Sequence, residues 1–421
     1  MDHFLYRNGI LHAEDVPVTK IANEVGTPFY VYSKATLERH YNVMANAFKE
    51  IPTMICYSVK ANSNLAVLKT LADLGSGADA VSEGEIRRAR AAGIPPEKIV
   101  FSGVGKTREE IRYALGINIH QFNAESREEL EMINEIADDL GVKASVAIRV
   151  NPDVDAGSHD KISTGRKTDK FGIAWGEVVD CYEFCKSLDY INIRGIDCHI
   201  GSQLTNLDPF QKAFNKVVDL VGELRELGHN IETLDLGGGL GIPYQSQEND
   251  LPSPEDYAKM IIETIKHLGC NLILEPGRLI AGNSGVLVTS VTRVKKTEEK
   301  TFIIVDSAMN DLARPSMYGS EHEIITVKQE ESNVIESNID IVGPICETSD
   351  RFIRNISFPT VSQDDLIAIR SVGAYGAVMS STYNSRPLIP EIMVNKDQYA
   401  VIRSRPDYED MLGMDIIPEW E

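Results

Sequence analysis

The sequence has a shortage of basic residues. Its 42 Lys and Arg residues are outnumbered by 63 Asp and Glu residues, so the net charge is −21 at pH 7. An acidic surface argues against nucleic acid or an anionic membrane as a partner. No apolar run approaches the roughly 20 residues that cross a bilayer, and the first residues do not read as a signal peptide. We therefore expect no nucleic-acid partner and no membrane partner.

Cysteine is also scarce. The six cysteines form no C-x-x-C pair, and no cysteine–histidine cluster accompanies Cys181 and Cys185, which stand four residues apart. This pattern argues against a zinc site and against a disulfide framework. It predicts that the protein has no metal site and that it works in a reducing, cytoplasmic compartment.

What the sequence does contain is a long alternation of strand-like runs and amphipathic helical segments. The eight apolar runs cover residues 54–59, 77–81, 99–103, 119–123, 144–150, 193–200, 232–237 and 271–276. The clearest helix follows Asp208 as its cap and Pro209 as its opening, and it ends at Gly228. Eight such repeats predict a closed (β/α)8 barrel, typically ~250 residues long. A doubly wound open sheet is the alternative, but the first run lacks a G-x-G-x-x-G fingerprint.

The rest of the chain reads as a second domain. After residue 281, β-branched and alternating runs follow one another without long helices between them. The early run "FYVYS" precedes the barrel rhythm. We therefore predict an α/β fold with a TIM-like (β/α)8 barrel at residues 35–280. A mostly-β domain would be formed by residues 281–421 together with residues 1–34. The polar segment 152–170 predicts a long loop after the fifth strand.

Unusual residues fall where the predicted barrel strands end, which is where barrel enzymes hold their chemistry. Lys60 ends the first run, His199 the sixth and Glu275 the eighth, while "GGGLG" (237–241) follows the seventh. Each has an ordinary explanation: a solvated lysine, a packed histidine or a glycine turn. Their joint placement at one rim favours a site.

Together these residues match what a pyridoxal phosphate site needs. A lysine amine can bond to the cofactor's aldehyde, and a carboxylate can pair with the protonated ring nitrogen. Bare glycine N–H groups can bind a phosphate, with Ser202, Gly277 and Arg278 nearby in barrel order. A flat imidazole can stack on the ring. An aldolase that uses a lysine amine without the cofactor is the competing interpretation.

The sequence also resembles a known family, the fold-type III pyridoxal phosphate decarboxylases, and within it the branch that acts on meso-diaminopimelate. The resemblance covers nearly the whole chain and rests on "YSVKAN", "GADAVSEGE", "CHIGSQ", "LDLGGGLGIPY", "EPGR", "MNDLARPSMYG", "GPICETSD" and "GAYGAVMSSTYNSRP". It implies decarboxylation of meso-2,6-diaminopimelate to L-lysine and carbon dioxide. A decarboxylase of the ornithine or arginine type is the alternative. "EPGR" and "GPICE" disfavour alanine racemase, and the long segment after the barrel disfavours a cofactor-carrier protein.

The resemblance also implies roles for the matching residues. The implied catalytic residues are Lys60, which bonds to the cofactor, His199, which stacks on its ring, and Cys346, which returns a proton. The implied remaining cofactor ligands are Asp79, Ser202, Gly238, Gly239, Glu275, Gly277, Arg278 and Tyr375. The implied substrate ligands are Arg278, Arg314, Tyr318, Glu347 and Tyr375. In this family Cys346 and Glu347 reach the site of the other subunit, which implies a homodimer with a shared active site.

Overall fold

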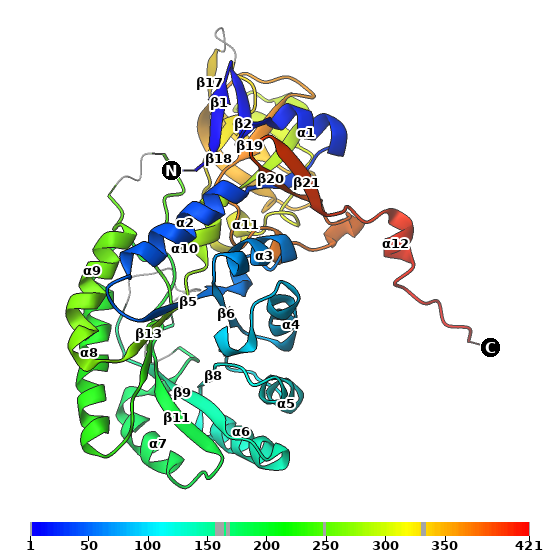
Figure 1. Cartoon of the computed structure of the whole chain (residues 1–421). Coiled ribbons are helices and arrows are strands. Elements are labelled where there is room, and N and C mark those ends of the chain that lie inside the picture. The colour runs from blue at the N-terminus through cyan, green and yellow to red at the C-terminus, as the bar shows by residue number, and fades with distance from the viewer. Residues whose placement is uncertain (1, 156–163, 166–168, 247–249, 330–333, 421) are drawn as a thin grey trace. The chain divides into compact units, whose positions relative to one another are not determined.

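The computed structural model describes residues 2–155, 164–165, 169–246, 250–329 and 334–420. Within these ranges the chain forms two compact units (Figure 1). One unit comprises residues 38–243 and 249–280, and the other comprises residues 1–37, 244–248 and 281–421. Much of the polar segment 152–170 lies outside the described residues, so the loop predicted there stays a prediction.

The first unit is a closed barrel of eight parallel strands, as the sequence predicted. Its strands are β5 (Thr53–Ser58), β6 (Gly77–Ala80), β7 (Ile99–Phe101), β8 (Gln121–Ala124), β9 (Ala144–Asn151), β11 (Ile191–Asp197), β12 (Thr233–Asp235) and β13 (Asn271–Leu274). Each pairs with its neighbour in chain order, β13 pairs with β5, and β8 pairs with β9, so the ring is complete. The two-residue strand β10 (Ile173–Ala174) adds to β9.

Helices follow the barrel strands and cover their outer face (Figure 1). They are α3 (Leu65–Asp73), α4 (Glu83–Ala91), α5 (Arg108–Gly116), α6 (Arg127–Leu140), α7 (Val178–Cys185), α8 (Asp208–Glu226), α9 (Pro254–Ile265) and the short α10 (Arg278–Ala281), while α2 (Lys34–Ala47) precedes β5. Several of these helices begin at a polar capping residue. Thr107 and Glu110 form a capping box on α5, and Ser253 and Asp256 form another on α9.

The cap predicted for α8 was wrong. Leu207 occupies the N-cap position, and Asp208 is already the first helical residue. The side chain of Asn206 accepts a hydrogen bond from the Asp208 N–H at 2.8 Å, so the upstream amide satisfies the helix start instead. Pro209 opens the first turn and Gly228 follows the helix with φ +87°, as expected.

The second unit is built mainly of strands, as predicted. They are β1 (Phe4–Arg7), β2 (Ile10–Ala13), β3 (Val16–Pro17), β4 (Phe29–Ser33), β14 (Gly285–Lys296), β15 (Thr301–Val305), β16 (Ile324–Thr326), β17 (Ile335–Val342), β18 (Arg351–Pro359), β19 (Leu366–Ile369), β20 (Glu391–Asn395) and β21 (Gln398–Arg403). Its described helices are α1 (Val18–Val25), α11 (Arg314–Tyr318) and α12 (Tyr408–Leu412). The large sheet runs β18-β17-β15-β14-β4-β20-β21, and β19 pairs with β14 and β16.

The first residues of the chain complete this β unit. Strand β4 pairs antiparallel with β14 and parallel with β20, so an N-terminal strand lies between two C-terminal ones. Its inward residues Phe29 and Val31 share one buried core with Val286, Val288 and Ile392. Burial of this shared apolar surface is what holds the sequence-distant segments together.

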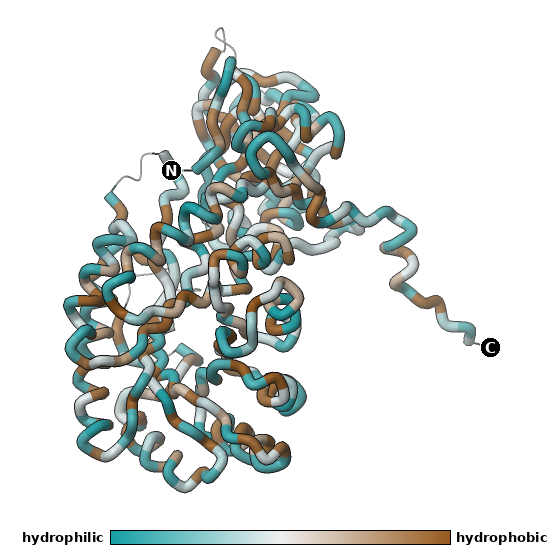
Figure 2. Tube along the Cα trace, in the orientation of Figure 1, coloured by the Kyte–Doolittle hydropathy of each residue, from teal (hydrophilic) through white to brown (hydrophobic). Residues whose placement is uncertain are grey.

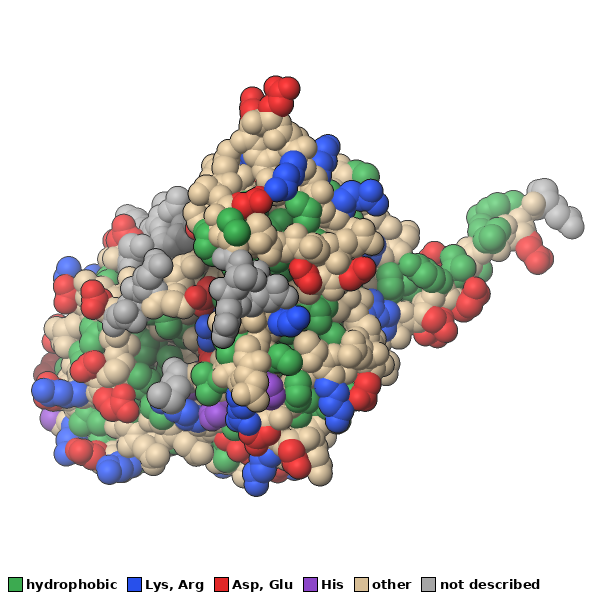
Figure 3. Space-filling view, turned by 90° about the horizontal axis from the view of Figure 1, so that it is seen from above, with side chains coloured by type: hydrophobic (Ala, Val, Ile, Leu, Met, Phe, Trp, Pro, Cys, Tyr) green, Lys and Arg blue, Asp and Glu red, His purple; other side chains and the backbone are tan. Residues whose placement is uncertain are grey.

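The last described residues carry unusual exposed apolar side chains. Met414, Ile416, Ile417 and Trp420 are 75%, 89%, 91% and 87% exposed. Figure 2 shows brown hydrophobic stretches along this extension beyond α12, and Figure 3 shows green side chains along it. Such a surface normally marks a contact site. Among the described residues, no helix is both long and apolar enough to span a membrane.

Candidate active site

Lys60 lies where strand β5 ends. The strand passes into the single 3-10 turn of Val59–Ala61, which places Lys60 just beyond the last β5 residue, Ser58. Its Nζ donates to Asp79 Oδ2 of β6 at 2.5 Å. The Ser58 hydroxyl also lies 2.7 Å from that oxygen and 2.9 Å from the backbone carbonyl oxygen of Glu275. The lysine amine is therefore directed by a buried carboxylate on the neighbouring strand.

Asp79 is charged despite its burial. Burial alone would raise the pKa of this fully buried carboxyl group. The positive charge of Lys60 and the hydrogen bonds from Lys60 and Ser58 outweigh that effect and hold the pKa of Asp79 below its usual value. Lys60 and Asp79 thus form an ion pair inside the barrel rim.

Three further carboxyl groups gather nearby. Oxygen atoms of Asp197, Asp235 and Glu275 all lie within 4.8 Å of one another, and all three residues are buried. Burial, followed by repulsion from Asp197, raises the pKa of Asp235 to about 7. Burial and neighbouring carboxylates likewise raise the pKa of Glu275 and of Asp197 well above their usual values. Like charges this close cannot all ionise, so the cluster retains protons near neutral pH.

Buried donors support this acidic cluster. The Asn123 amide donates to Asp235 Oδ2 at 3.1 Å and to Glu275 Oε1 at 3.4 Å, and the Ser102 hydroxyl donates to Glu275 Oε1 at 3.3 Å. Arg149 lies 3.7 Å from Asp197 Oδ2 through its Nε and 2.8 Å from Glu125 Oε1 through its Nη1. Asn123 in β8 and Ser102 just after β7 thus hold the Glu275 carboxyl group, while Arg149 pairs with Asp197 and Glu125.

The glycine run after β12 leaves no room for side chains. A Cβ on Gly238 would lie 2.3 Å from the Glu275 carbonyl oxygen, and a Cβ on Gly239 would lie 2.4 Å from the Gly201 carbonyl oxygen. Gly237 and Gly239 also adopt φ of +62° and +111°, which favour glycine. The turn is partly exposed at Gly238 and Gly239, and a close-packed glycine turn of this kind suits a phosphate.

His199 lies against the same turn. The Gly238 N–H donates to His199 Nδ1 at 3.2 Å, so this ring nitrogen is unprotonated. Burial first, and then the positive charges of Arg149 and Lys60, lower the pKa of His199 to about 3. A neutral, flat imidazole next to a phosphate-type turn can stack on a planar ligand.

Arg278 and Ser202 continue this rim. Arg278 is 5% exposed, and its Nη2 donates to the Ser202 hydroxyl at 3.0 Å. Gly277 precedes Arg278 at the end of β13 and is buried. The barrel unit therefore brings nine of the predicted residues to neighbouring strand ends: Lys60, Asp79, His199, Ser202, Gly238, Gly239, Glu275, Gly277 and Arg278.

The remaining predicted residues belong to the β unit. Arg314 begins α11 and is buried, and Tyr318 ends that helix with its ring 5.8 Å from the Arg314 guanidinium. Tyr375 is partly buried and has φ +56°, an uncommon backbone conformation for a tyrosine. Such strain is more common at functional sites than elsewhere.

Cys346 and Glu347 are both exposed. Asp350 fixes the loop that carries them, because its carboxylate accepts the N–H groups of Met309 and Ile345, each at 2.7 Å. Glu347 accepts hydrogen bonds from the Tyr383 and Ser349 hydroxyls, which lower the pKa of its carboxyl group. Glu347 is therefore an exposed anion.

The three comparisons agree on the family. The family described as pyridoxal-dependent decarboxylase, pyridoxal binding domain, matches residues 34–282. Diaminopimelate decarboxylase of Zymomonas mobilis is 48% identical over 99% of each chain, and that of Vibrio cholerae is 47% identical over 100% of each. The chain belongs to the pyridoxal-dependent decarboxylases.

Solved structures of this decarboxylase family have the same fold. Diaminopimelate decarboxylase of M. jannaschii in co-complex with L-lysine matches with a TM-score of 0.94, 39% identity, and coverage of 99% of this chain and 98% of that one. The Helicobacter pylori enzyme complexed with L-lysine matches with a TM-score of 0.90, 42% identity, and coverage of 94% and 98%.

The barrel of this decarboxylase fits the cofactor of its family. The partly exposed glycine turn at Gly238 and Gly239 has no side chains in the way, so a phosphate can approach its backbone. The proton-retaining carboxyl of Glu275 offers a partner for a basic ring nitrogen. Lys60 offers an amine that Asp79 directs. The individual roles of these residues stay predictions.

Sequence reasoning missed several buried groups of the decarboxylase barrel. Asp197 and Asp235 interrupt the apolar runs "IRGIDCHI" and "ETLDLG", and Ser102 follows the apolar strand β7. A single carboxylate inside a buried strand is a usable signal, because it needs a nearby partner. The pairing with Glu275 itself could not be read from the sequence.

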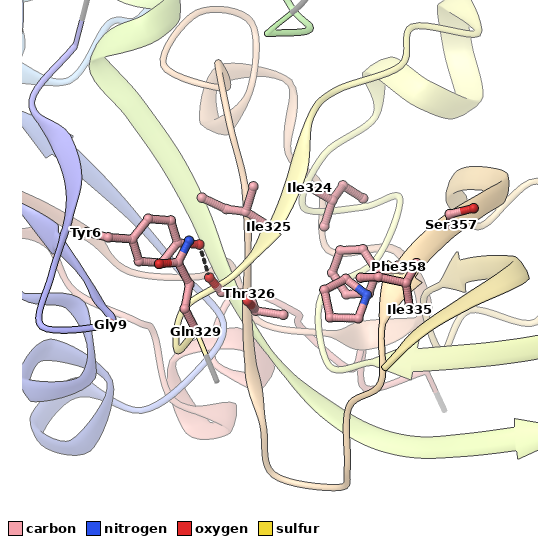
Figure 4. A pocket seen from close by; sticks show the side chains of 10 residues that line it. Tyr6, Gly9, Ile324, Ile325, Thr326, Gln329, Ile335, Ser357 and Phe358 are labelled. Carbon is pink, nitrogen blue, oxygen red and sulfur yellow. Dashed lines mark hydrogen bonds between the residues drawn. The ribbon is translucent and has the colours of Figure 1, made fainter. Parts of the chain in front are cut away.

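Figure 4 shows a separate pocket of about 740 Å³ in the β unit. Its lining mixes apolar residues such as Ile324 and Phe358 with polar ones such as Gln329 and Ser357. The Tyr6 hydroxyl donates to the Thr326 carbonyl oxygen at its edge. None of the residues predicted for catalysis lines it, so it is distinct from the candidate active site.

Proposed function

We infer that the protein catalyses the decarboxylation of meso-2,6-diaminopimelate, which yields L-lysine and carbon dioxide and would be the last step of lysine biosynthesis. The observation that carries this inference is the full-length similarity, at 47–48% identity, to diaminopimelate decarboxylases. The lysine complexes of two solved relatives agree with it, because lysine is the expected product. The directed Lys60 amine beside a proton-retaining Glu275 supports the chemistry.

When bound, pyridoxal phosphate supplies a ring that accepts the electron pair released as carbon dioxide leaves. In our proposal Lys60 would hold the cofactor through its amine, which Asp79 keeps aligned. Glu275 would offer its carboxyl group to the ring nitrogen, and His199 would pack on the ring. Cys346 delivers the proton that replaces the lost carboxylate on the substrate carbon. His199 suits its packing role because it is neutral.

The choice of substrate would depend on the distal end of the substrate molecule. Meso-diaminopimelate carries a second carboxylate there, whereas ornithine and arginine carry only a cation. Arg278 and Arg314 are suited to bind a carboxylate in a two-pronged grip, with Tyr318 and Tyr375 beside the substrate. The anionic Glu347 would receive the distal ammonium.

We also propose a homodimer whose active sites combine residues of both subunits. Cys346 and Glu347 are exposed, which suits residues that serve a neighbouring chain. The exposed apolar side chains of Ile416, Ile417 and Trp420 favour association as well. Light scattering on the cofactor-loaded protein should give twice the chain mass of 46.6 kDa, and a single-chain mass would contradict the proposal. All six cysteines are free, which suits the cytoplasmic location that we propose.

A substrate panel tests the activity. The protein, loaded with pyridoxal phosphate, is offered meso-diaminopimelate, ornithine, arginine and lysine separately, with Lys60→Ala as the blank. Carbon dioxide release and products are followed by mass spectrometry. We expect lysine from meso-diaminopimelate alone, and none in the blank. Turnover of ornithine or arginine instead would overturn the proposed substrate while keeping the chemistry.

A further inference from the structure

Arg314 does not stand alone in the β unit. Its Nε donates to His322 Nε2 at 3.3 Å, and its Nη2 donates to the Ser320 hydroxyl at 3.2 Å. The guanidinium also lies over the Tyr244 ring, 4.9 Å from its centroid. With an exposed fraction of 5%, this arginine is held from three directions. Its orientation is set by these neighbours and not by solvent.

The hydrogen bonds of His322 define its protonation. A guanidinium can only donate, so His322 Nε2 must accept. A backbone carbonyl can only accept, and the Arg370 carbonyl oxygen lies 2.9 Å from His322 Nδ1, so Nδ1 must donate. The two contacts together require a neutral imidazole with its proton on Nδ1. Arg314 and the backbone after β19 thus select one tautomer.

His322 is itself firmly placed. It is 1% exposed, and its ring meets the Tyr244 ring edge-on, with centroids 4.9 Å apart at 83°. Glu323 adds two backbone hydrogen bonds, to the Tyr244 carbonyl oxygen at 3.1 Å and from the Arg370 N–H at 2.9 Å. The backbone at Arg370 therefore fixes the position of His322, and His322 in turn fixes the Arg314 side chain.

We propose that His322 is a positioning residue that fixes the direction of the Arg314 guanidinium fork for binding a substrate carboxylate. This rests on the proposed function, in which Arg314 grips the distal carboxylate of meso-diaminopimelate. A planar fork binds a carboxylate through two parallel hydrogen bonds only when its plane and direction are correct. The hydrogen bond from Arg314 Nε to His322 sets both the plane and the direction of the fork, because Nε lies in the guanidinium plane. The Ser320 hydroxyl accepts from Nη2 and so holds the same edge of the guanidinium.

Two substitutions separate positioning from packing. His322→Phe keeps a ring against Tyr244 but removes the acceptor for Arg314 and the donor to Arg370. We expect it to raise KM for meso-diaminopimelate by about 10- to 100-fold, the effect of a lost hydrogen bond to a charged group, with kcat changed much less. His322→Gln retains one acceptor and one donor and should recover most of that loss. His12→Phe is the matched control, because the His12 ring nitrogen bonds instead to the Ile10 carbonyl oxygen.

A double-substitution cycle tests whether His322 acts through Arg314. In an Arg314→Met background, His322→Phe should lower kcat/KM by no more than about 2-fold, because the group that it orients is gone. Equal losses in both backgrounds, or a Phe variant with an unchanged KM, would overturn the proposal. Thermal unfolding and the absorbance of bound cofactor show whether each variant is folded and loaded.

A direct spectroscopic measurement is independent of substrate. In protein carrying ¹⁵N-labelled histidine, the His322 signals, assigned by their loss in His322→Gln, should report a neutral ring protonated at Nδ1. Arg314→Met should shift the Nε2 resonance. A ring protonated at Nε2 would overturn the proposal even if the enzyme is active. Failure of the wild type to decarboxylate meso-diaminopimelate would overturn the proposed function, while the tautomer would still be decided.

Discussion

The two units of the chain present their predicted functional residues in different ways. In the barrel, Lys60, Asp79 and Glu275 are linked through short contacts among neighbouring strand ends, and the carboxyl groups are buried. In the β unit, Cys346 and Glu347 lie on an exposed loop. The charges of these barrel residues are set by contacts among neighbouring strand ends. In the β unit, Cys346 and Glu347 differ from the buried Arg314, and their exposure suits residues that we propose serve a second subunit.

Removing the amine should have the largest effect and tests the barrel side of this comparison. Lys60→Ala should lower kcat/KM by on the order of 10⁴-fold or more, because no other group replaces a covalent anchor. Steady-state release of carbon dioxide checks this. The control is Lys69→Ala, which removes a lysine paired with Asp73 on the outer surface of α3. Activity within about 10-fold of wild type in Lys60→Ala would show that this lysine is not the anchor.

Mixing inactive subunits tests the exposed side. If Cys346 serves the other subunit, mixtures of Lys60→Ala and Cys346→Ser chains should regain up to about a quarter of wild-type activity, because one site in each mixed dimer is intact. The two variants are unfolded together, refolded and assayed, with each refolded alone as the control. No recovery in mixtures shown to contain mixed dimers would place Cys346 in its own subunit's site.

Filling the glycine turn should weaken cofactor binding. In Gly238→Ala the new Cβ meets the Glu275 carbonyl oxygen at 2.3 Å, so the turn must shift. We expect the Kd for pyridoxal phosphate to rise by about 100-fold, as for other misplaced ligand groups. Gly222→Ala in α8, where nothing lies within 4 Å of the added carbon, should bind normally. Equal affinity in both variants would remove Gly238 from the cofactor site.

The acidic cluster should make barrel stability depend on pH. The pKa of Asp235 is raised to about 7, so the folded protein binds more protons than the unfolded chain between about pH 4 and 7. The free energy of unfolding should therefore fall as pH rises through this window. Asp235→Asn should flatten that fall by a few kcal/mol at most, measured by urea unfolding of cofactor-free protein. Asp139→Asn on the outer surface of α6 serves as the control, and an unchanged slope in Asp235→Asn would contradict the cluster.

The sequence predicted the barrel well for a physical reason. Parallel strands covered on both faces are nearly continuous apolar runs, so all eight stood out between amphipathic helices. The loop glycines and the lysine after β5 stood out because they break that pattern. The strand β4 was also placed correctly with the C-terminal sheet.

Contacts between segments that are far apart in the chain could not be predicted from the sequence. His322 lies in no motif, and its role depends on a carbonyl oxygen 48 residues away at Arg370. The gathering of Asp197 and Asp235 around Glu275 likewise depends on barrel closure. The α8 cap was misjudged because Asn206 and Asp208 are both good capping residues, and only the backbone shows which one precedes the helix.

Cysteine accessibility has a practical consequence. Five of the six thiols are buried, and Cys346 alone is exposed. A maleimide dye added to the native protein should therefore attach at one defined position without any engineering. Because that position lies in the proposed subunit contact, its labelling rate would report how fast the subunits separate and rejoin.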